Sequence, residues 1–519
     1  MREESLNIHD KHQFELKLGY KAIDGSKNAL YNLEMYFFIP YSLDINSHTY
    51  EKRIFYKDNQ TYIRLKTPNI ALRNILIDND GPFDKLELSC KNLLKDPNKI
   101  NISNYIHHTK MFCCILKSAI RDHVEFISSQ NLDSEVEILI KEYLQLVQEI
   151  RIRYKELRKI LNIPSISSNL ISYYLFGDEF ISHTIEEYSF RLVECIDKID
   201  SKELVKYNQD IYKIIKDEIS HREKNKIPSI PKVDSNNEEF IFRKSVLKKH
   251  IESILFLKTH SERQGVMLEQ ILFGLAAGIS MMFATAIAFF SQIKFGSISI
   301  PLFFILVVSY VFKDRIKEWL RQLFSNNLSK NVFDHKIDLY TSENERIGWI
   351  KELFYFIKER DIPKEILNLR NRDHITEIEN DWLGEKSAVY ISQVKLHSQK
   401  LKGIYKEFNN IEGINSIMRF DISRFLNKMD DSQKPVFILS GEGHKEIYGE
   451  RVYHLNLVIK YSIQNDSWYQ RFRIVINREG IKRIENIVSE KTASNDSNNH
   501  KTFEQGSKEE KIGFNTLSN

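Results

Sequence analysis

The stretch Ile271–Ile293 reads ILFGLAAGISMMFATAIAFFSQI and contains no charged residue. A helix rises ~1.5 Å per residue, so a helix of this length reaches across the ~30 Å hydrocarbon core of a bilayer. A second uncharged run, FGSISIPLFFILVVSYVF, follows at Phe295–Phe312. Because the two runs are nearly contiguous, we expect a tight hairpin of two transmembrane helices. The alternative, a helical hairpin buried in a soluble domain, is disfavoured because the first run has no polar stripe.

Basic residues lie on both outer flanks of this hairpin. They are Arg243, Lys244, Lys248, Lys249, Lys258 and Arg263 before it, and Lys313, Arg315, Lys317 and Arg321 after it. The positive-inside rule then predicts that both polar parts and both termini are cytoplasmic. We therefore expect an integral protein of the cell or inner membrane, with two spans and with Arg263, Lys313, Arg315 and Trp319 at the membrane interface. The amphipathic segment 313–324 is interpreted either as a helix in the headgroup layer or as a continuation of the second span.

Gly274 and Gly278 form a G-x-x-x-G motif within the first run. Small residues one turn apart let two helix backbones approach closely. Two interpretations follow: self-association between chains, which predicts a homo-oligomer, or packing of the hairpin on itself, which we favour. Because neither run contains an acidic or basic residue, an ion path or proton relay through them is disfavoured.

The composition excludes some classes of protein. The 519 residues hold 75 Lys+Arg against 71 Asp+Glu, and a net charge of +4 does not suit a strongly basic nucleic-acid binder. The four cysteines, Cys90, Cys113, Cys114 and Cys195, show no C-x-x-C spacing, which favours reduced thiols over a disulfide framework. The polar N-terminus predicts no cleavable signal peptide.

The remaining patterns predict an α+β membrane protein with the hairpin between two mixed helical and β cytoplasmic parts. We expect an N-terminal part over residues 1–237, β-rich at 14–75 and then a helical bundle, with a linker at 222–237. A membrane-proximal helix at 238–265 and the hairpin at 266–312 follow. The C-terminal part, 313–488, is predicted to be helical to about residue 430 and then stranded, and 489–519 to be a disordered tail. Strand patterns near both ends suggest that the two parts share a sheet.

Residues 134–161 carry a heptad seam of apolar residues. Its members are Val136, Ile140, Tyr143, Val147, Ile150, Tyr154, Leu157 and Leu161. A seam of this kind forms either a coiled coil between two chains or one long helix packed against its neighbours. We favour the packed helix, because further leucines widen the apolar face beyond a strict seam.

Catalytic signatures are absent from the sequence: there is no Walker A loop, no G-x-G-x-x-G, no H-E-x-x-H and no G-x-S-x-G. One polar row, Glu179, His183 and Glu187, shares a helix face and suits a metal or a proton relay, although a solvated face is favoured. A single E-x-x-H, Glu218 and His221, lacks the second copy that a di-iron site needs. We therefore expect no cofactor and no metal-ligating residues, and the sequence identifies no catalytic residue.

These observations predict a non-enzymatic, membrane-anchored scaffold, sensor or effector that faces the cytoplasm. Its expected partners are the lipid bilayer, a second copy of the chain and a cytoplasmic protein of unspecified kind. Two alternatives remain open. One is a membrane-tethered enzyme, such as a hydrolase, with an unrecognised site, and the other is an oligomeric pore-forming effector.

Overall fold

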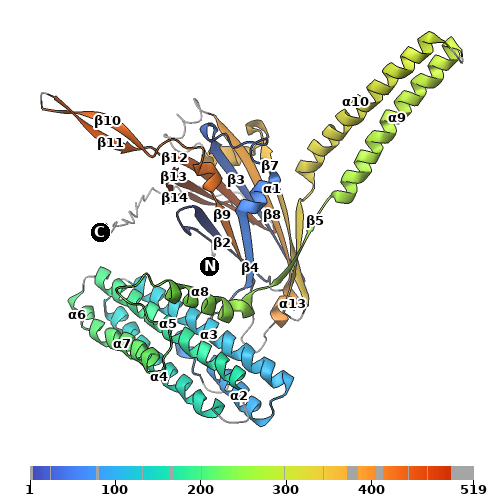
Figure 1. Cartoon of the computed structure of the whole chain (residues 1–519). Helices are drawn as coiled ribbons and strands as arrows, with labels where there is room; N and C mark the ends of the chain where they lie inside the picture. Colours follow the sequence, from blue (N-terminus) through green and yellow to red (C-terminus); the bar gives the residue numbers. More distant parts are fainter. Residues whose placement is uncertain are drawn as a thin grey trace, which may run out of the picture.

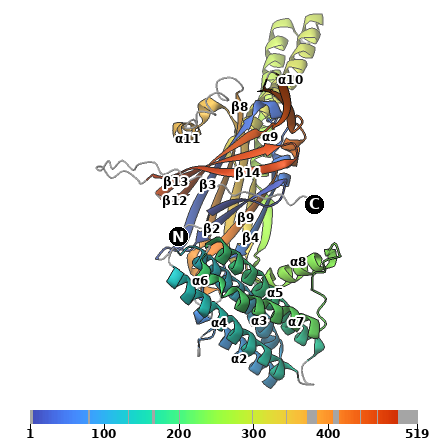
Figure 2. The ribbon, with the colours of Figure 1, turned by 90° about the vertical axis from the view of Figure 1, so that its left-hand side faces the viewer.

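The computed structural model describes the chain except residues 1–3, 24, 78–80, 131–132, 163–166, 200, 297–298, 343, 371–383, 405–412, 442, 465 and 493–519. Its parts follow one another along the molecule: a helical bundle lies at one end, β-sheets form the middle, and a helical hairpin projects from the other end (Figure 1). The view turned by 90° shows the same succession from hairpin to bundle (Figure 2).

An eight-stranded antiparallel sheet forms the centre of the molecule. Its strands in spatial order are β14 (Gly480–Thr492), β13 (Asp466–Asn477), β12 (Tyr453–Ile463), β3 (Asn28–Pro40), β8 (Glu385–His397), β7 (Arg346–Ile357), β6 (His335–Tyr340) and β5 (Lys258–Arg263). Strand β3 comes from the N-terminal part but pairs with β12 on one side and β8 on the other. The expectation that the two polar parts share a sheet is confirmed, so they form one body.

A four-stranded sheet packs against this central sheet. Its strands in spatial order are β1 (Glu4–Ile8), β2 (Gln13–Lys21), β9 (Gly413–Asp421) and β4 (Asn59–Leu65). Aromatic rings fill the space between them: Phe37 lies 5.6 Å from Phe420, and Phe55 of α1 (Lys52–Asp58) stacks on Phe354 at 3.9 Å. Large buried rings of this kind contribute much of the apolar area that stabilises a core.

The bundle consists of long helices, two of which are buried all round over Met111–Leu116 and Gly177–Ile185. They are α2 (Pro82–Lys95), α3 (Lys99–Ser128), α4 (Asp133–Leu161), α5 (Ser168–Ile199), α7 (Asn208–Lys224) and α8 (Glu238–Glu252), with a short α6 (Lys202–Val205) between two of them. All eight seam residues of α4 are buried inside this chain, none more than 2% exposed. The packed-helix interpretation is therefore confirmed, and the seam is not available to a second chain.

Two predicted helical regions differ in the structure. The membrane-proximal helix expected at 238–265 ends at Glu252, and strand β5 leads into the hairpin instead. The described residues of the region 331–430, expected to be mainly helical, form β6, β7, β8 and β9 together with short helices, among them α11 (Lys364–Arg370), α13 (Ser398–Gly403) and α14 (Ser423–Leu426). The helix-like spacing of charges misled the prediction there, because β-branched and aromatic residues such as Ile350 and Phe354 gain more by packing inside the sheet.

Strands β10 (Gln433–Ser440) and β11 (Gly443–Glu450) pair with each other and, among the described strands, with nothing else. The remaining short elements are η1 (Tyr41–Leu43), η2 (Leu72–Asn74), η3 (Ser253–Leu255) and η4 (Glu359–Asp361). The expected linker at 222–237 includes the last residues of α7, and an irregular segment then reaches α8. Strand β14 extends to Thr492, so the first residues of the predicted disordered tail are in a strand, and residues 493–519 lie outside the described residues.

Candidate functional site: the apolar hairpin and its root

Helices α9 (Val266–Phe295) and α10 (Ile300–Asn331) run side by side and project from the sheet (Figures 1 and 2). Their contact face is built mainly from small and hydroxyl side chains: Ala276, Ser280 and Ser291 of α9 and Ser309 of α10 are buried there, together with one larger residue, Leu302 of α10. Small residues let the two backbones approach closely, as in helix pairs within membranes. The sequence therefore places its least bulky side chains between the helices.

The outer surface of the hairpin is apolar. Exposed large side chains include Ile271, Leu275, Met281, Met282, Phe289, Phe290 and Ile293 of α9, and Ile300, Phe303, Phe304, Val308, Val311 and Phe312 of α10. Monomeric soluble proteins rarely expose contiguous apolar patches beyond a few hundred Å². This hairpin thus reverses the usual arrangement, with polar hydroxyls inside and large apolar groups outside.

The two glycines of the G-x-x-x-G motif face away from the partner helix. A Cβ built on Gly274 or Gly278 would meet nothing within 4 Å. The favoured interpretation, packing of the hairpin on itself through these glycines, is therefore wrong. The stripe through Ala276 and Ser280 makes that contact, because it lies on the other side of α9. The glycine face is open within this chain.

The two helices are not equally apolar. Among the described residues, only α9 is long and apolar enough to cross a membrane by length and composition. Phe295 ends α9, and the apolar part of α10 is confined to Ile300–Phe312, about 20 Å of helix at ~1.5 Å per residue. The expected second span at Phe295–Phe312 is thus divided by the turn. The guanidinium of Arg321 lies 5.2 Å from the ring of Phe273, so the charged half of α10 runs beside the first half of α9.

The predicted interface residues lie at different levels of the hairpin. Trp319 is 62% exposed on α10, and Arg315 is exposed on the same helix. Lys313 lies 3.6 Å from the ring centre of Tyr310, a cation–π contact, and Arg263 precedes α9 with Glu269 at 3.4 Å. Helix α10 is continuous through residues 313–324, so this segment continues the second apolar run and is not a separate helix.

The root of the hairpin is fixed to the sheet edge. Strands β5 and β6 pair with each other and run directly into α9 and out of α10. Asp334 holds this junction: its carboxylate accepts hydrogen bonds from Lys52 Nζ at 2.7 Å, Tyr56 Oη at 2.9 Å and the Phe354 amide at 2.9 Å. Gly265, at φ 77°, makes the turn into α9 in a conformation that favours glycine. These contacts set the direction of the hairpin.

The polar row predicted on α5 does not converge on a ligand. Glu179 pairs with Arg243 at 2.7 Å and Glu187 with Lys244 at 3.0 Å, both across to α8, while His183 lies 3.6 Å from Glu186. Across the described part of the chain, no group of three His, Cys, Asp or Glu side chains is arranged to hold a metal ion. The two glutamates therefore join α5 to α8, and the favoured solvated face is wrong because Glu179 and His183 are buried.

A deeper ionic cluster, which the sequence did not predict as a unit, lies between α4, α5 and α7. Arg151 donates to Asp178 at 2.5 Å and to Glu218 at 2.8 Å, and His221 lies 2.8 Å from Asp178. Burial raises the pKa of Asp178, but the hydrogen bond from His221 and the charge of Arg151 outweigh it and hold that pKa below its usual value. The only sequence signal was the Glu218/His221 spacing.

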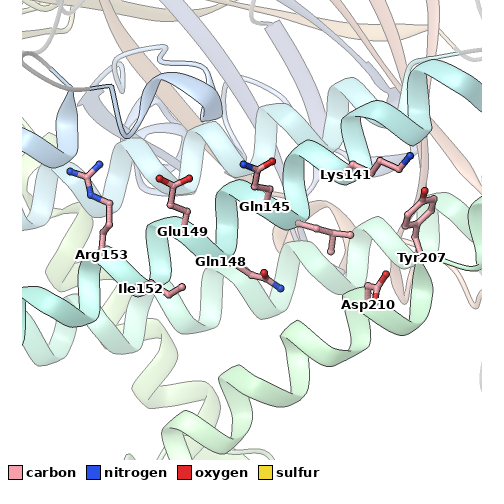
Figure 3. Close-up of a pocket in the computed structure, with 9 residues that line it drawn as sticks. Lys141, Gln145, Gln148, Glu149, Ile152, Arg153, Tyr207 and Asp210 are labelled. Carbon is pink, nitrogen blue, oxygen red and sulfur yellow. The ribbon is translucent and has the colours of Figure 1, made fainter.

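The buried thiols and a groove beside α4 give no indication of chemistry. Burial raises the pKa of Cys114 to about 12, so this thiol is not a ready nucleophile. A shallow groove of about 530 Å³ lies between α4 and the start of α7 (Figure 3). It is lined mainly by Lys141, Gln145, Gln148, Glu149, Ile152, Arg153, Tyr207 and Asp210. Its charges of both signs are spread along the groove and do not converge.

The chain matches no protein-family model, and no curated protein and no solved structure is similar to it.

Proposed function

We propose that this protein is anchored in a membrane by the α9–α10 hairpin, and that its sheets and bundle lie together on the cytoplasmic side. The observation that carries the proposal is the reversed hairpin, with Ser280 and Ser291 inside and residues such as Phe290 outside. In a bilayer, lipid chains contact this apolar surface, whereas in solution it would be exposed to water, which is unfavourable. Burying one large apolar side chain is worth about 1.5–3 kcal/mol, so the outer surface as a whole disfavours water by far more than typical folding stability.

The proposed topology has two crossings, with both termini in the cytoplasm of a cell whose plasma or inner membrane holds the protein. The basic flanks and the single lysine near the turn support this orientation. The apolar part of α10 is shorter than the core of a bilayer, at ~20 Å against ~30 Å. Lys313 and Arg315 would therefore extend their side chains to the cytoplasmic headgroups.

The proposed class is a non-enzymatic scaffold, sensor or effector. The ion pairs of Glu179 and Glu187 with α8, which account for both carboxylates of the polar row, support this class over a tethered hydrolase. Self-association is a second element of the proposal, supported by the open face at Gly274 and Gly278. An oligomeric pore would need that face to assemble several hairpins.

Extraction and labelling test the anchor and the topology separately. The full chain should stay in membranes after a carbonate wash, and its release would contradict the anchor. Lys294→Cys, near the turn, should react with an impermeant maleimide on intact cells. Val233→Cys, fully exposed in the linker before α8, should react only after permeabilisation. If Lys294→Cys stays unlabelled in cells and in permeabilised cells, the hairpin ends inside the bilayer, and the two crossings are wrong while the anchor stands.

A further inference from the structure

The root of the α9–α10 hairpin brings two acidic residues together. Asp334 lies just before β6, and its amide donates a hydrogen bond to the backbone carbonyl of Glu352 in β7 at 2.7 Å. The side chain of Glu352 points into the core, where only 5% of the residue is exposed, whereas 16% of the Asp334 side chain reaches solvent. One of the two carboxyl groups is therefore buried much more deeply than the other.

Charged and titratable side chains surround Glu352 from four neighbouring elements. They are Asp334 and His335 at the start of β6, Lys52 and Tyr56 of α1, Tyr390 of β8, and Arg263 of β5, which pairs in register with His335. Of these groups, Tyr390 bonds to Glu352 directly: its hydroxyl donates to Glu352 Oε1 at 2.5 Å. Lys52 and Tyr56 both bond to the Asp334 carboxylate.

The charges of this cluster do not balance if both carboxyl groups are ionised. Lys52 lies 2.7 Å from Asp334 and neutralises that carboxylate. Among the described residues, no cation forms an ion pair with Glu352, and burial lowers the pKa of His335, which favours the neutral imidazole. A buried charge without a counter-ion is costly, so such a group takes up a proton instead. The geometry therefore favours the neutral acid at Glu352.

The pKa of Glu352 follows the same balance. Burial raises this pKa above its ordinary value, the hydrogen bond from Tyr390 opposes the rise, and the nearby charge of Asp334 adds to it. Because the pKa is raised in the folded state, the contribution of Glu352 to stability is complete below the unfolded value of ~4.3. That contribution is lost as pH rises through the folded pKa.

Both legs of the hairpin are attached to Asp334. Helix α10 ends three residues before it, and the amide of Gln264, directly before the turn into α9, donates to the Asp334 carbonyl oxygen at 2.9 Å. Figure 1 shows α9 rising from β5 at this edge of the sheet. A negative charge on Glu352 repels the Asp334 carboxylate, and a displaced Asp334 no longer holds Gln264.

We propose that the root is a proton-sensitive hinge, in which a proton on Glu352 holds both legs of the hairpin on the sheet and its release loosens them. The proton passes between the Glu352 carboxyl group and solvent, and no other covalent bond changes. Gly265, at φ 77°, lies between Gln264 and α9 and provides the turn about which the hairpin moves. The inference concerns the junction with the sheet and does not depend on the proposed anchor.

Spin labels on both sides of the root test the hinge in the full-length protein in mild detergent. Labelled cysteines replace Trp319, 62% exposed on α10, and Leu30, 41% exposed on β3, in a Cys195→Ser background whose other thiols are buried. From about pH 5 to about pH 9, the width of the distance distribution should increase about twofold. Glu352→Gln, which keeps the shape of the neutral acid, should stay narrow throughout. The control Glu359→Gln, exposed on η4, should broaden as the wild type does.

Two results would overturn the hinge. One is a wild-type distribution that keeps its width over the whole pH range. The other is a Glu352→Gln variant that still broadens, because another group, such as His335, would then carry the pH dependence.

Infrared difference spectroscopy measures the proton itself. Raising the pH of the wild-type protein should remove the carbonyl band of a protonated carboxyl group, and Glu352→Gln should lack this change. Tyr390→Phe leaves Glu352 in place and removes the hydrogen bond that opposes its raised pKa, so the band should disappear at higher pH than in the wild type. A wild-type protein without a band assignable to Glu352, or an unchanged midpoint in Tyr390→Phe, would contradict the inference.

Discussion

The helical bundle and the helical hairpin of this chain follow opposite packing rules. In the bundle, large side chains such as Phe112 and Tyr154 are buried, together with the ionic cluster around Arg151. In the hairpin, Ala276 and Ser280 are buried, and the large apolar side chains point outward. The same chain thus contains one helical region with large apolar side chains inside and another with most of them outside.

The difference shows which solvent each region suits. In water, burial of large apolar groups drives helices together, and the polar groups inside must be paired. In lipid, apolar side chains gain nothing from leaving the solvent, so close packing of small residues drives association. If both regions follow these rules, substitutions of one kind will have opposite consequences in the two places.

The largest effect is expected from Arg151→Ala in the bundle. This change leaves Asp178 and Glu218 buried without their shared cation, which costs about 3–5 kcal/mol. Unfolding of the full-length protein in mild detergent, followed by pulse proteolysis, measures the loss. The control is Arg191→Ala, whose side chain is half exposed beside Glu187, and it should cost about 0–1 kcal/mol. Equal losses would mean that the cluster is not effectively buried.

A smaller effect, and one that tests the hairpin, is expected from Met282→Lys. Met282 is 65% exposed on α9, so in water the substitution by lysine would have little effect on stability. In a bilayer, a lysine at the helix centre costs about 2.5–3.5 kcal/mol of insertion free energy, and the fraction of chain recovered in membranes should fall. The matched change Ile152→Lys on α4, at 61% exposure, should leave membrane content unchanged. Unchanged membrane content in both variants would contradict the proposal that lipid surrounds α9.

Glycine to alanine substitutions sharpen the comparison further. A Cβ on Gly177 of α5 would lie 2.3 Å from Tyr154 Oη inside the bundle. Overpacking of this kind costs about 1–3 kcal/mol, so Gly177→Ala should lower the melting temperature. A Cβ on Gly278 in the hairpin meets nothing within 4 Å in its own chain, so Gly278→Ala should leave the melting temperature of the monomer unchanged. Loss of stability in Gly278→Ala would indicate that a second chain covers the glycine face.

The smallest effect concerns acid. The pKa of Asp178 is lowered in the folded state, so its contribution to stability is complete above the unfolded value of ~3.9 and is lost as pH falls through the folded pKa. The bundle should therefore lose stability below about pH 4, and Asp178→Asn should reduce that pH dependence. Fluorescence-detected unfolding at a series of pH values measures the stability of the wild type and of Asp178→Asn. If Asp178→Asn and the wild type lose stability equally in acid, the pH dependence of stability arises from other carboxylates, such as Glu186.

The sequence predicted those elements whose signal is local. The uncharged run of α9, the long apolar stripe of α4 and the alternating strands near both ends each show their periodicity within one segment. The pairing of β3 with β8 and β12 was foreseen only as a shared sheet, because partner and register are set by residues hundreds of positions apart. The role of Glu179 was missed for the same reason, since Arg243 reaches it from another helix. Strand β7 was predicted as a helix because its charges mimic helical spacing.

The position of β3 has a consequence for how this chain is made. Residues 28–40 are synthesised well before their neighbours in the sheet, residues 385–397 and 453–463. At about 5–20 residues per second, this strand waits on the order of tens of seconds for its first partner. The apolar segment 266–295 emerges during that wait, so an anchored chain would reach the bilayer before its central sheet exists. During synthesis, the unpaired edges of β3 would therefore need protection from aggregation, and the central sheet would form only after residues 453–463 have been made.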